Sequence, residues 1–147
     1  MIYVNQQVYN EPASTCTRNQ TLTGTTYFLW SMTHKLSGER KAFIPYRIPP
    51  NTGYNDPYYD LFGVTLSTTA TESLTGNTTP TECVVNLICG EWYLKIYEQL
   101  SSTNLNPSLA YNVVNETIVT VNCYEQNEPI SYTNVDDVFI IYNPDNE

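Results

Sequence analysis

Apolar and polar residues alternate in short blocks along this chain, and clusters of Gly, Pro, Asn and Ser separate the blocks. Alternation with a period of two places one set of side chains on each face of a β-strand. β-branched and aromatic residues, which favour strands, fill most of the blocks. No window long enough for a helix shows an apolar stripe with helical spacing. The pattern therefore predicts an all-β protein.

The clearest hairpin is predicted from two alternating segments, residues 26–35 and 40–48. Residues 36–39 between them read Leu-Ser-Gly-Glu, a turn in which glycine accepts a positive φ. Pro45 has no N–H to give to a strand ladder, so it predicts an edge position or an early end of the second strand. The residues expected in the core of this hairpin are Phe28, Trp30, Met32, Phe43 and Ile44.

The strictest alternation lies in residues 91–99, where Trp92, Leu94 and Ile96 share one face. Such a strand belongs to a sheet with one buried face. The other predicted strands are residues 61–67 (with Phe62, Val64 and Leu66 inward), 82–87, 113–121 and 135–142, the last ending in a continuous apolar run.

About seven or eight short strands of this kind predict a single antiparallel β-sandwich with immunoglobulin-like topology. Residues 1–24 are interpreted as an N-terminal arm or edge strand followed by a loop, and residues 25–147 as the sandwich domain. A chain of 147 residues is long enough for one real core, and one domain is expected.

The charge of the chain excludes several functional classes. Fifteen acidic and six basic residues give a formal net charge of −9, which repels the phosphate backbone and argues against nucleic-acid binding. No apolar run is long enough to cross a bilayer, so no membrane partner is expected. The first residues have neither a basic start nor an apolar run, and we expect no signal peptide.

Candidate catalytic and metal-binding residues are few. His34 is the only histidine and has no nucleophile motif beside it, so it is interpreted as a surface or edge residue and no enzyme is predicted. Asp56 and Asp60 lie in the oxygen-rich loop of residues 49–60, but their spacing matches no known calcium loop. We therefore predict neither a metal nor a cofactor.

The four cysteines leave two interpretations open. Cys16, Cys83, Cys89 and Cys123 can be free thiols packed as small apolar groups, or they can form two disulfides in an oxidising compartment. Because no export signal is visible, free thiols are the preferred interpretation. The spacing of Cys83 and Cys89 is not that of a zinc site.

Tyrosines are the most informative feature of the loops. Tyr46, Tyr54, Tyr58 and Tyr59 gather with Pro, Asn and Gly in one region. Tyrosine beside Ser, Asn and Gly is typical of recognition loops, because a ring with two torsions gives contact area at little entropic cost. Three interpretations follow: the rings cover their own loop, contact another protein, or stack on a sugar ring.

One segment resembles a known family. Residues 90–107, GEWYLKIYEQLSSTNLNP, resemble a pattern in small virion proteins of tailed phages, including crAss-like phages and other phages of Bacteroidetes hosts. That pattern is a Gly-led aromatic strand, K-x-Y-E-Q, and a Ser/Thr loop ending in T-N-x-D-P. The upstream segments YFLWSMTHKLSGERKAFIP and YDLFGVT fit the same proteins. This chain departs from the pattern at Asn106, where the family often has Asp, and at Asn115-Glu-Thr117, where it tends to have Glu-x-Gly.

The resemblance implies an immunoglobulin-like structural protein of the virion, assembled in the host cytoplasm. We expect an auxiliary capsid protein that decorates the head and docks on the major capsid protein or other virion proteins. Two alternatives stay open, a neck or tail adaptor or head-fibre base, and a carbohydrate-binding module that adheres to host glycans. A homo-oligomer is compatible with each of these functions. The residues expected at the interface are Tyr46, Tyr54, Tyr58, Tyr59, Asn104 and Asn106.

Overall fold

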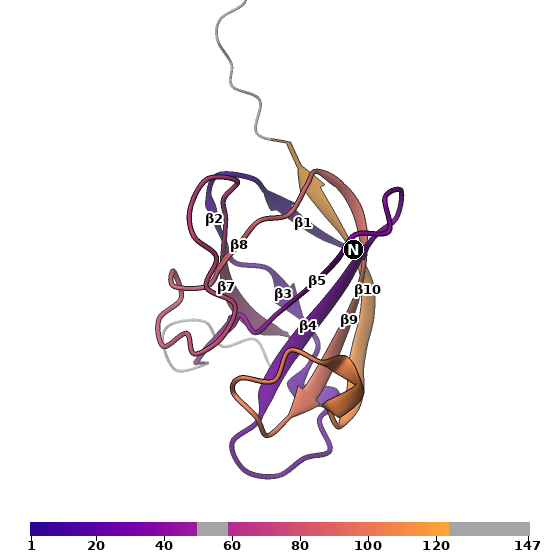
Figure 1. The fold of residues 1–147 in the computed structure, drawn as a ribbon. Coiled ribbons are helices and arrows are strands. Elements are labelled where there is room, and N and C mark those ends of the chain that lie inside the picture. The colour runs from indigo at the N-terminus through magenta and orange to yellow at the C-terminus, as the bar shows by residue number, and fades with distance from the viewer. Residues whose placement is uncertain (50–58, 124–147) are drawn as a thin grey trace, which may run out of the picture.

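The computed structural model describes residues 1–49 and 59–123, apart from the side chain of Arg18, as two β-sheets packed face to face (Figure 1). Within these residues there are ten strands, two 3-10 turns and no α-helix, so the all-β prediction is confirmed. The elements are β1 (Ile2–Asn5), β2 (Tyr9–Asn10), β3 (Ala13–Ser14), η1 (Thr17–Asn19), β4 (Tyr27–His34), β5 (Arg40–Phe43), β6 (Tyr46–Ile48), β7 (Asp60–Leu66), β8 (Val84–Val85), β9 (Gly90–Gln99), η2 (Pro107–Leu109) and β10 (Asn112–Asn122).

The first sheet has the strand order β1-β10-β9-β4-β5. Its centre is β9, which pairs antiparallel with β4 on one side and β10 on the other. The second sheet is built around β7. Because Leu61 of β7 pairs with both Ala13 and Ile48, β3 and β6 lie on opposite sides of that strand.

The sheets are mixed rather than purely antiparallel, which corrects one part of the sequence prediction. β1 runs parallel to β10, with Val4 opposite Val121, and β8 runs parallel to β7. The alternation of a strand fixes which face it buries but not the direction of its neighbour. β1 can therefore pair with the free edge of β10, although the two strands are far apart in the chain.

The core lies between the two sheets and contains the predicted inward residues. The hairpin residues Phe28, Trp30, Met32, Phe43 and Ile44 are buried, and so are Phe62, Val64, Leu66, Trp92, Leu94 and Ile96 of β7 and β9. Ring contacts join the sheets, because Phe62 of β7 lies 5.2 Å from Trp30 and 6.0 Å from Phe28 of β4 between ring centroids. The alternation thus predicted the buried faces of β4, β7 and β9.

Pro45 marks the point where the chain changes sheets. β5 ends at Phe43 as an edge strand, and the chain continues into β6 of the second sheet, so the predicted early end is confirmed. The strand predicted at residues 82–87 is reduced to the two residues of β8. The predicted strand at residues 135–142 lies outside the described residues.

Candidate contact surface

The loop between β9 and β10 is held in place by its own amide side chains. Gln99 donates from Nε2 to the backbone oxygens of Ser101 and Asn104, both at 2.9 Å, and accepts from Asn104 Nδ2 at 2.8 Å. Asn106 accepts hydrogen bonds from the backbone N–H and the hydroxyl of Ser108, which caps η2. Asn104 and Asn106 therefore shape the loop, and their places as interface residues remain a prediction.

Glu98 fixes a second loop to the same end of the molecule. Its fully buried carboxylate accepts hydrogen bonds from the backbone N–H groups of Thr21, at 2.8 Å, and Leu22, at 3.3 Å, and from the Thr21 hydroxyl. A buried carboxylate is stable only when such donors surround it. Residues 98 and 99 of the K-x-Y-E-Q segment thus anchor two loops on one strand end.

Asp60 anchors the start of β7 and is no longer a candidate cation ligand. Its buried carboxylate accepts from the backbone N–H groups of Cys16 and Thr17 at 3.0 and 2.6 Å, and forms an ion pair with Arg47 at 2.8 Å. These partners use the oxygens that a calcium ion would need. The other candidate oxygen ligand, Asp56, lies outside the described residues.

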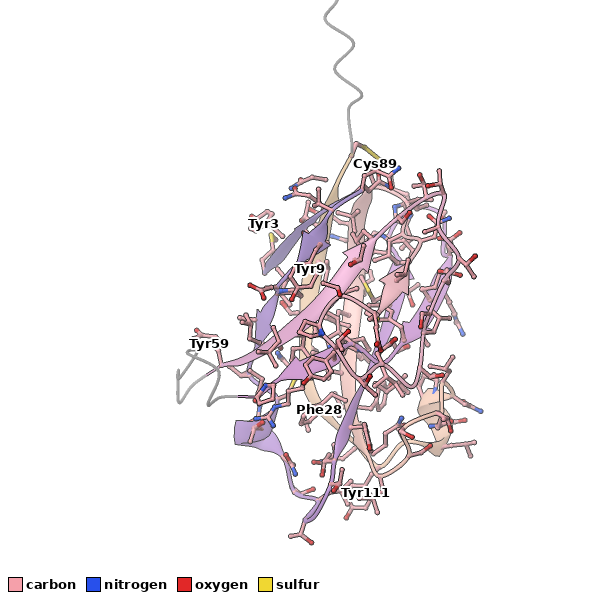
Figure 2. The ribbon with its side chains drawn as sticks, turned by 90° about the vertical axis from the view of Figure 1, so that its left-hand side faces the viewer. Tyr3, Tyr9, Phe28, Tyr59, Cys89 and Tyr111 are labelled. Atoms are coloured by element: carbon pink, nitrogen blue, oxygen red, sulfur yellow. A yellow bond between two sulfur atoms is a disulfide. The ribbon has the colours of Figure 1, made fainter. Side chains whose placement is uncertain are left out.

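Exposed apolar side chains gather on the loop after β9. Leu100, Leu109 and Tyr111 are 62%, 73% and 67% exposed. Together with Leu22 they line a shallow hollow of about 320 Å³. Figure 2 shows Tyr111 at the end of the molecule opposite Cys89. We call the surface formed by residues 19–27 and 99–112 the contact end.

The contact end carries no charged side chain, although the whole chain has a net charge of −9. Neither residues 19–27 nor residues 99–112 contain Asp, Glu, Lys or Arg. Charged residues are depleted at the centre of protein interfaces, where aromatic residues are enriched. The chemistry of this end is therefore suited to contact with another macromolecule.

Of the predicted interface tyrosines that the structure describes, Tyr46 lies beside this surface. Tyr46 is half-buried and lines a second hollow of about 200 Å³, shared with Tyr27 and with Ser102 of the loop after β9. Tyr59 is 49% exposed (Figure 2). Tyr54 and Tyr58 lie outside the described residues. Ser102 thus brings Tyr46 next to the loop that contains Asn104 and Asn106, and their sharing of an interface remains a prediction.

The sequence prediction included the loop of residues 100–110 among the contact elements, but it named Asn104 and Asn106 there and missed Leu100, Leu109 and Tyr111. A usable signal is present, because residues 99–112 combine several apolar side chains, among them Leu100, Leu109 and Tyr111, with small polar residues and no charge. An exposed apolar residue on a rigid loop is a better indicator of a contact than an asparagine that the loop itself can bind.

His34 is buried, which corrects the prediction of a surface residue. Its Nδ1 accepts a hydrogen bond from the Ser37 N–H at 3.1 Å, and the proton on Nε2 is then directed at the Cys89 carbonyl oxygen at 3.1 Å. A Cβ atom on Gly90 would lie 2.7 Å from Nε2, and Gly90 has a φ of +120°. His34 therefore holds a tight turn, and only glycine fits beside it.

The preferred interpretation of the cysteines is half correct. Cys16 and Cys83 are free and buried, but Cys89 and Cys123 form a disulfide with a Cα–Cα distance of 5.1 Å. The pairing of Gly90 with Val121 brings the start of β9 next to the end of β10, where the two cysteines lie. The sequence alone does not predict this pairing, because 34 residues separate the two cysteines.

The described part of the chain contains no group of three or more His, Cys, Asp or Glu side chains that could hold a metal ion. None of its helices could cross a membrane. Comparison of the chain with protein-family models, with curated proteins and with solved structures finds no match.

Proposed function

We propose that this protein is a structural component of a virion, an auxiliary capsid protein that decorates the head by docking its contact end on the major capsid protein. The observation that carries the proposal is the charge-free surface with the exposed side chains of Leu100, Leu109 and Tyr111. The resemblance of residues 90–107 to small phage virion proteins supports the same setting.

The rigidity of the loop between β9 and β10 is the second observation that supports the proposal. The hydrogen bonds of Gln99, Asn104 and Asn106 order the loop before any partner arrives. Little conformational entropy is then lost on binding, so a small apolar patch can contribute affinity. Many copies on a shell, each with a modest interface, bind strongly as a set.

The strand order supports an immunoglobulin-like topology, which is part of this proposal. In chain order, β4, β9 and β10 match strands C, F and G of one sheet, with β9 in the centre. In the other sheet the interrupted strand β2–β3, then β6 and β7, match strands B, D and E, with β7 in the centre. Trp30 lies on the strand that corresponds to C, where immunoglobulin domains bury a tryptophan.

The test compares two leucine variants at opposite ends of the sandwich. Leu109→Asp places a charge in the contact end and should weaken binding to purified heads of the parent phage about tenfold or more, as loss of an apolar anchor does. Leu36→Asp makes the same change at a turn residue that is 93% exposed at the other end, and should leave binding unchanged. Co-sedimentation measures both, and thermal melting confirms that each variant folds.

Equal binding by Leu109→Asp and the unchanged protein would contradict the proposal. Quantitative mass spectrometry of purified particles separates it from an adaptor or a head-fibre base. A decoration protein is present in hundreds of copies, whereas a neck or tail adaptor or a head-fibre base is present in few.

A carbohydrate-binding module is the second candidate, favoured by the hollow beside Tyr46. Tyr27, Tyr46, Arg47 and Asn77 line it, which gives aromatic and hydrogen-bonding groups of the kind that sugars use. If this function holds, the isolated protein binds a glycan array and Tyr46→Ala abolishes the signal. Tyr3→Ala, at an exposed tyrosine of β1 outside the hollow lining, serves as the matched control.

A further inference from the structure

The outer face of the five-stranded sheet carries a groove. Thr33 of β4, Arg40 of β5, and Lys95 and Tyr97 of β9 belong to its lining. Leu105 and Pro107 of the loop after β9 also line it. The neighbouring residues Met32, Leu94 and Ile96 point into the core, so the alternating side chains point outward. At about 500 Å³, the groove is large enough for an extended peptide segment rather than a single side chain.

Positive charge concentrates at this groove. Of the six Lys and Arg residues of the chain, Arg40, Lys41 and Lys95 contribute to the lining. Lys41 is bound to Glu72 at 2.8 Å. Lys95 is half-exposed and reaches only Glu116, at 3.9 Å. Arg40 is exposed and has no ion-pair partner among the described residues.

The complementary chemistry lies in the chain's own sequence. Residues 124–147, which we call the acidic segment, contain Glu125, Glu128, Asp136, Asp137, Asp145 and Glu147 and no Lys or Arg. Apolar residues Val-Phe-Ile-Ile-Tyr follow directly after the Asp pair. Acidic and apolar groups in one segment match a groove lined by cations, a tyrosine and a leucine.

The acidic segment begins within reach of the groove. Cys123 is tied to Cys89 at the start of β9, the end of the sheet where Lys35 N–H bonds to Glu91 and where β5 begins. Three strand spacings of about 4.8 Å separate β10 from β5. Residues 124–135 can span up to about 40 Å, so the distance sets no limit.

We propose that the groove between Arg40, Lys95 and Tyr97 is the docking site of the chain's own acidic segment. Docking pairs Asp136 and Asp137 with Arg40 and Lys95 and covers the apolar lining with the residues that follow. The attachment at Cys123 gives the segment a high effective concentration at the groove, so weak contacts suffice.

Carbodiimide cross-linking of the full chain, read by peptide mass spectrometry, tests this directly because it joins only carboxylates and amines in contact. We expect intramolecular cross-links from Lys95 to the acidic segment. In Arg40→Gln they should fall at least about fivefold, since the neighbouring cation is lost. They should fall similarly in 1 M salt, where the Debye length is about 3 Å.

Lys35→Gln is the matched control, because it removes one positive charge outside the groove lining and should leave the Lys95 cross-links unchanged. The Lys95–Glu116 cross-link reports that the sheet is intact in every sample. The proposal is overturned if that cross-link forms without any from Lys95 to the acidic segment, or if Arg40→Gln and Lys35→Gln have equal effects. Mixing isotope-labelled and unlabelled chains identifies a second copy as the occupant, which also overturns it.

Discussion

Cys16 and Cys83 are core side chains, although they carry reactive groups. Both are fully buried, and burial raises the pKa of each thiol from 9.0 to about 12. For Cys16 the neighbouring Asp60 adds to the shift, while a hydrogen bond with Ser14 opposes it. In the folded protein both thiols therefore stay protonated over the whole range in which a free cysteine ionises.

These thiols make stability depend on pH at the alkaline end. Because the folded pKa lies above the unfolded one, their contribution is complete below pH 9 and is lost as pH rises from about 9 toward 12. We expect the free energy of unfolding in urea to fall over this range, and less steeply in Cys83→Ala. Iodoacetamide at pH 9 should modify neither thiol before unfolding. Rapid native-state labelling of Cys83 would contradict this picture.

At the scale of elements, β9 joins the core to the contact end. Its first part buries Trp92, Leu94 and Ile96 against the second sheet, and its last two residues bind the loops. A strand with a strictly alternating core face therefore ends in two buried polar side chains, Glu98 and Gln99. The position of the contact end depends on those two residues.

Glu98→Gln should uncouple the loop of residues 20–22 from β9. The amide has one acceptor oxygen in place of two charged ones, so hydrogen bonds with the N–H groups of Thr21 and Leu22 are lost or weakened. We expect a loss of about 1.5–3 kcal/mol in the free energy of unfolding, measured in urea. Glu91→Gln, at an exposed pair with Lys35, should change it by less than about 1 kcal/mol. Equal effects of the two variants would show that the buried carboxylate has no special role.

The local alternation of apolar and polar residues predicted the long strands, because each of them buries one face and exposes the other. It located β4, β7, β9 and β10 to within a few residues, and the turn at residues 36–39. It could not predict the pairing of β1 with β10, or the cysteine bridge, because both depend on partners far along the chain. It also could not tell whether Asn104 and Asn106 bind their own loop or a partner, since amide groups suit both.

At the scale of the whole molecule, the two ends of the sandwich differ in chemistry. Residues 19–27 and 99–112, which form the surface of one end, contain no charged residue. The other end is closed by the Cys89–Cys123 disulfide (Figure 2), and the Cys89 carbonyl oxygen lies 3.1 Å from His34 Nε2. A disulfide does not persist in a reducing cytoplasm. If the proposed assembly in the host cytoplasm is correct, this bond forms after the particle leaves the cell.

Loss of the disulfide should lower stability only under oxidising conditions. Closing a loop of 34 residues stabilises a fold by about 3–4 kcal/mol through the entropy of the unfolded chain. The double variant Cys89→Ser, Cys123→Ser should be less stable than the unchanged protein by about that amount in urea without reductant. With dithiothreitol the two proteins should unfold alike. A difference that persists in reductant would assign the effect to packing instead.

The parallel pairing of β1 with β10 has a consequence for synthesis. Ile2 and Val4 are core residues whose only strand partner, residues 119–122, leaves the ribosome after every other described strand. Until then this apolar segment has no partner in its sheet, and contacts between distant segments form slowly. The first of the described strands to be made therefore gains its sheet partner last, and until then its apolar side chains are open to aggregation.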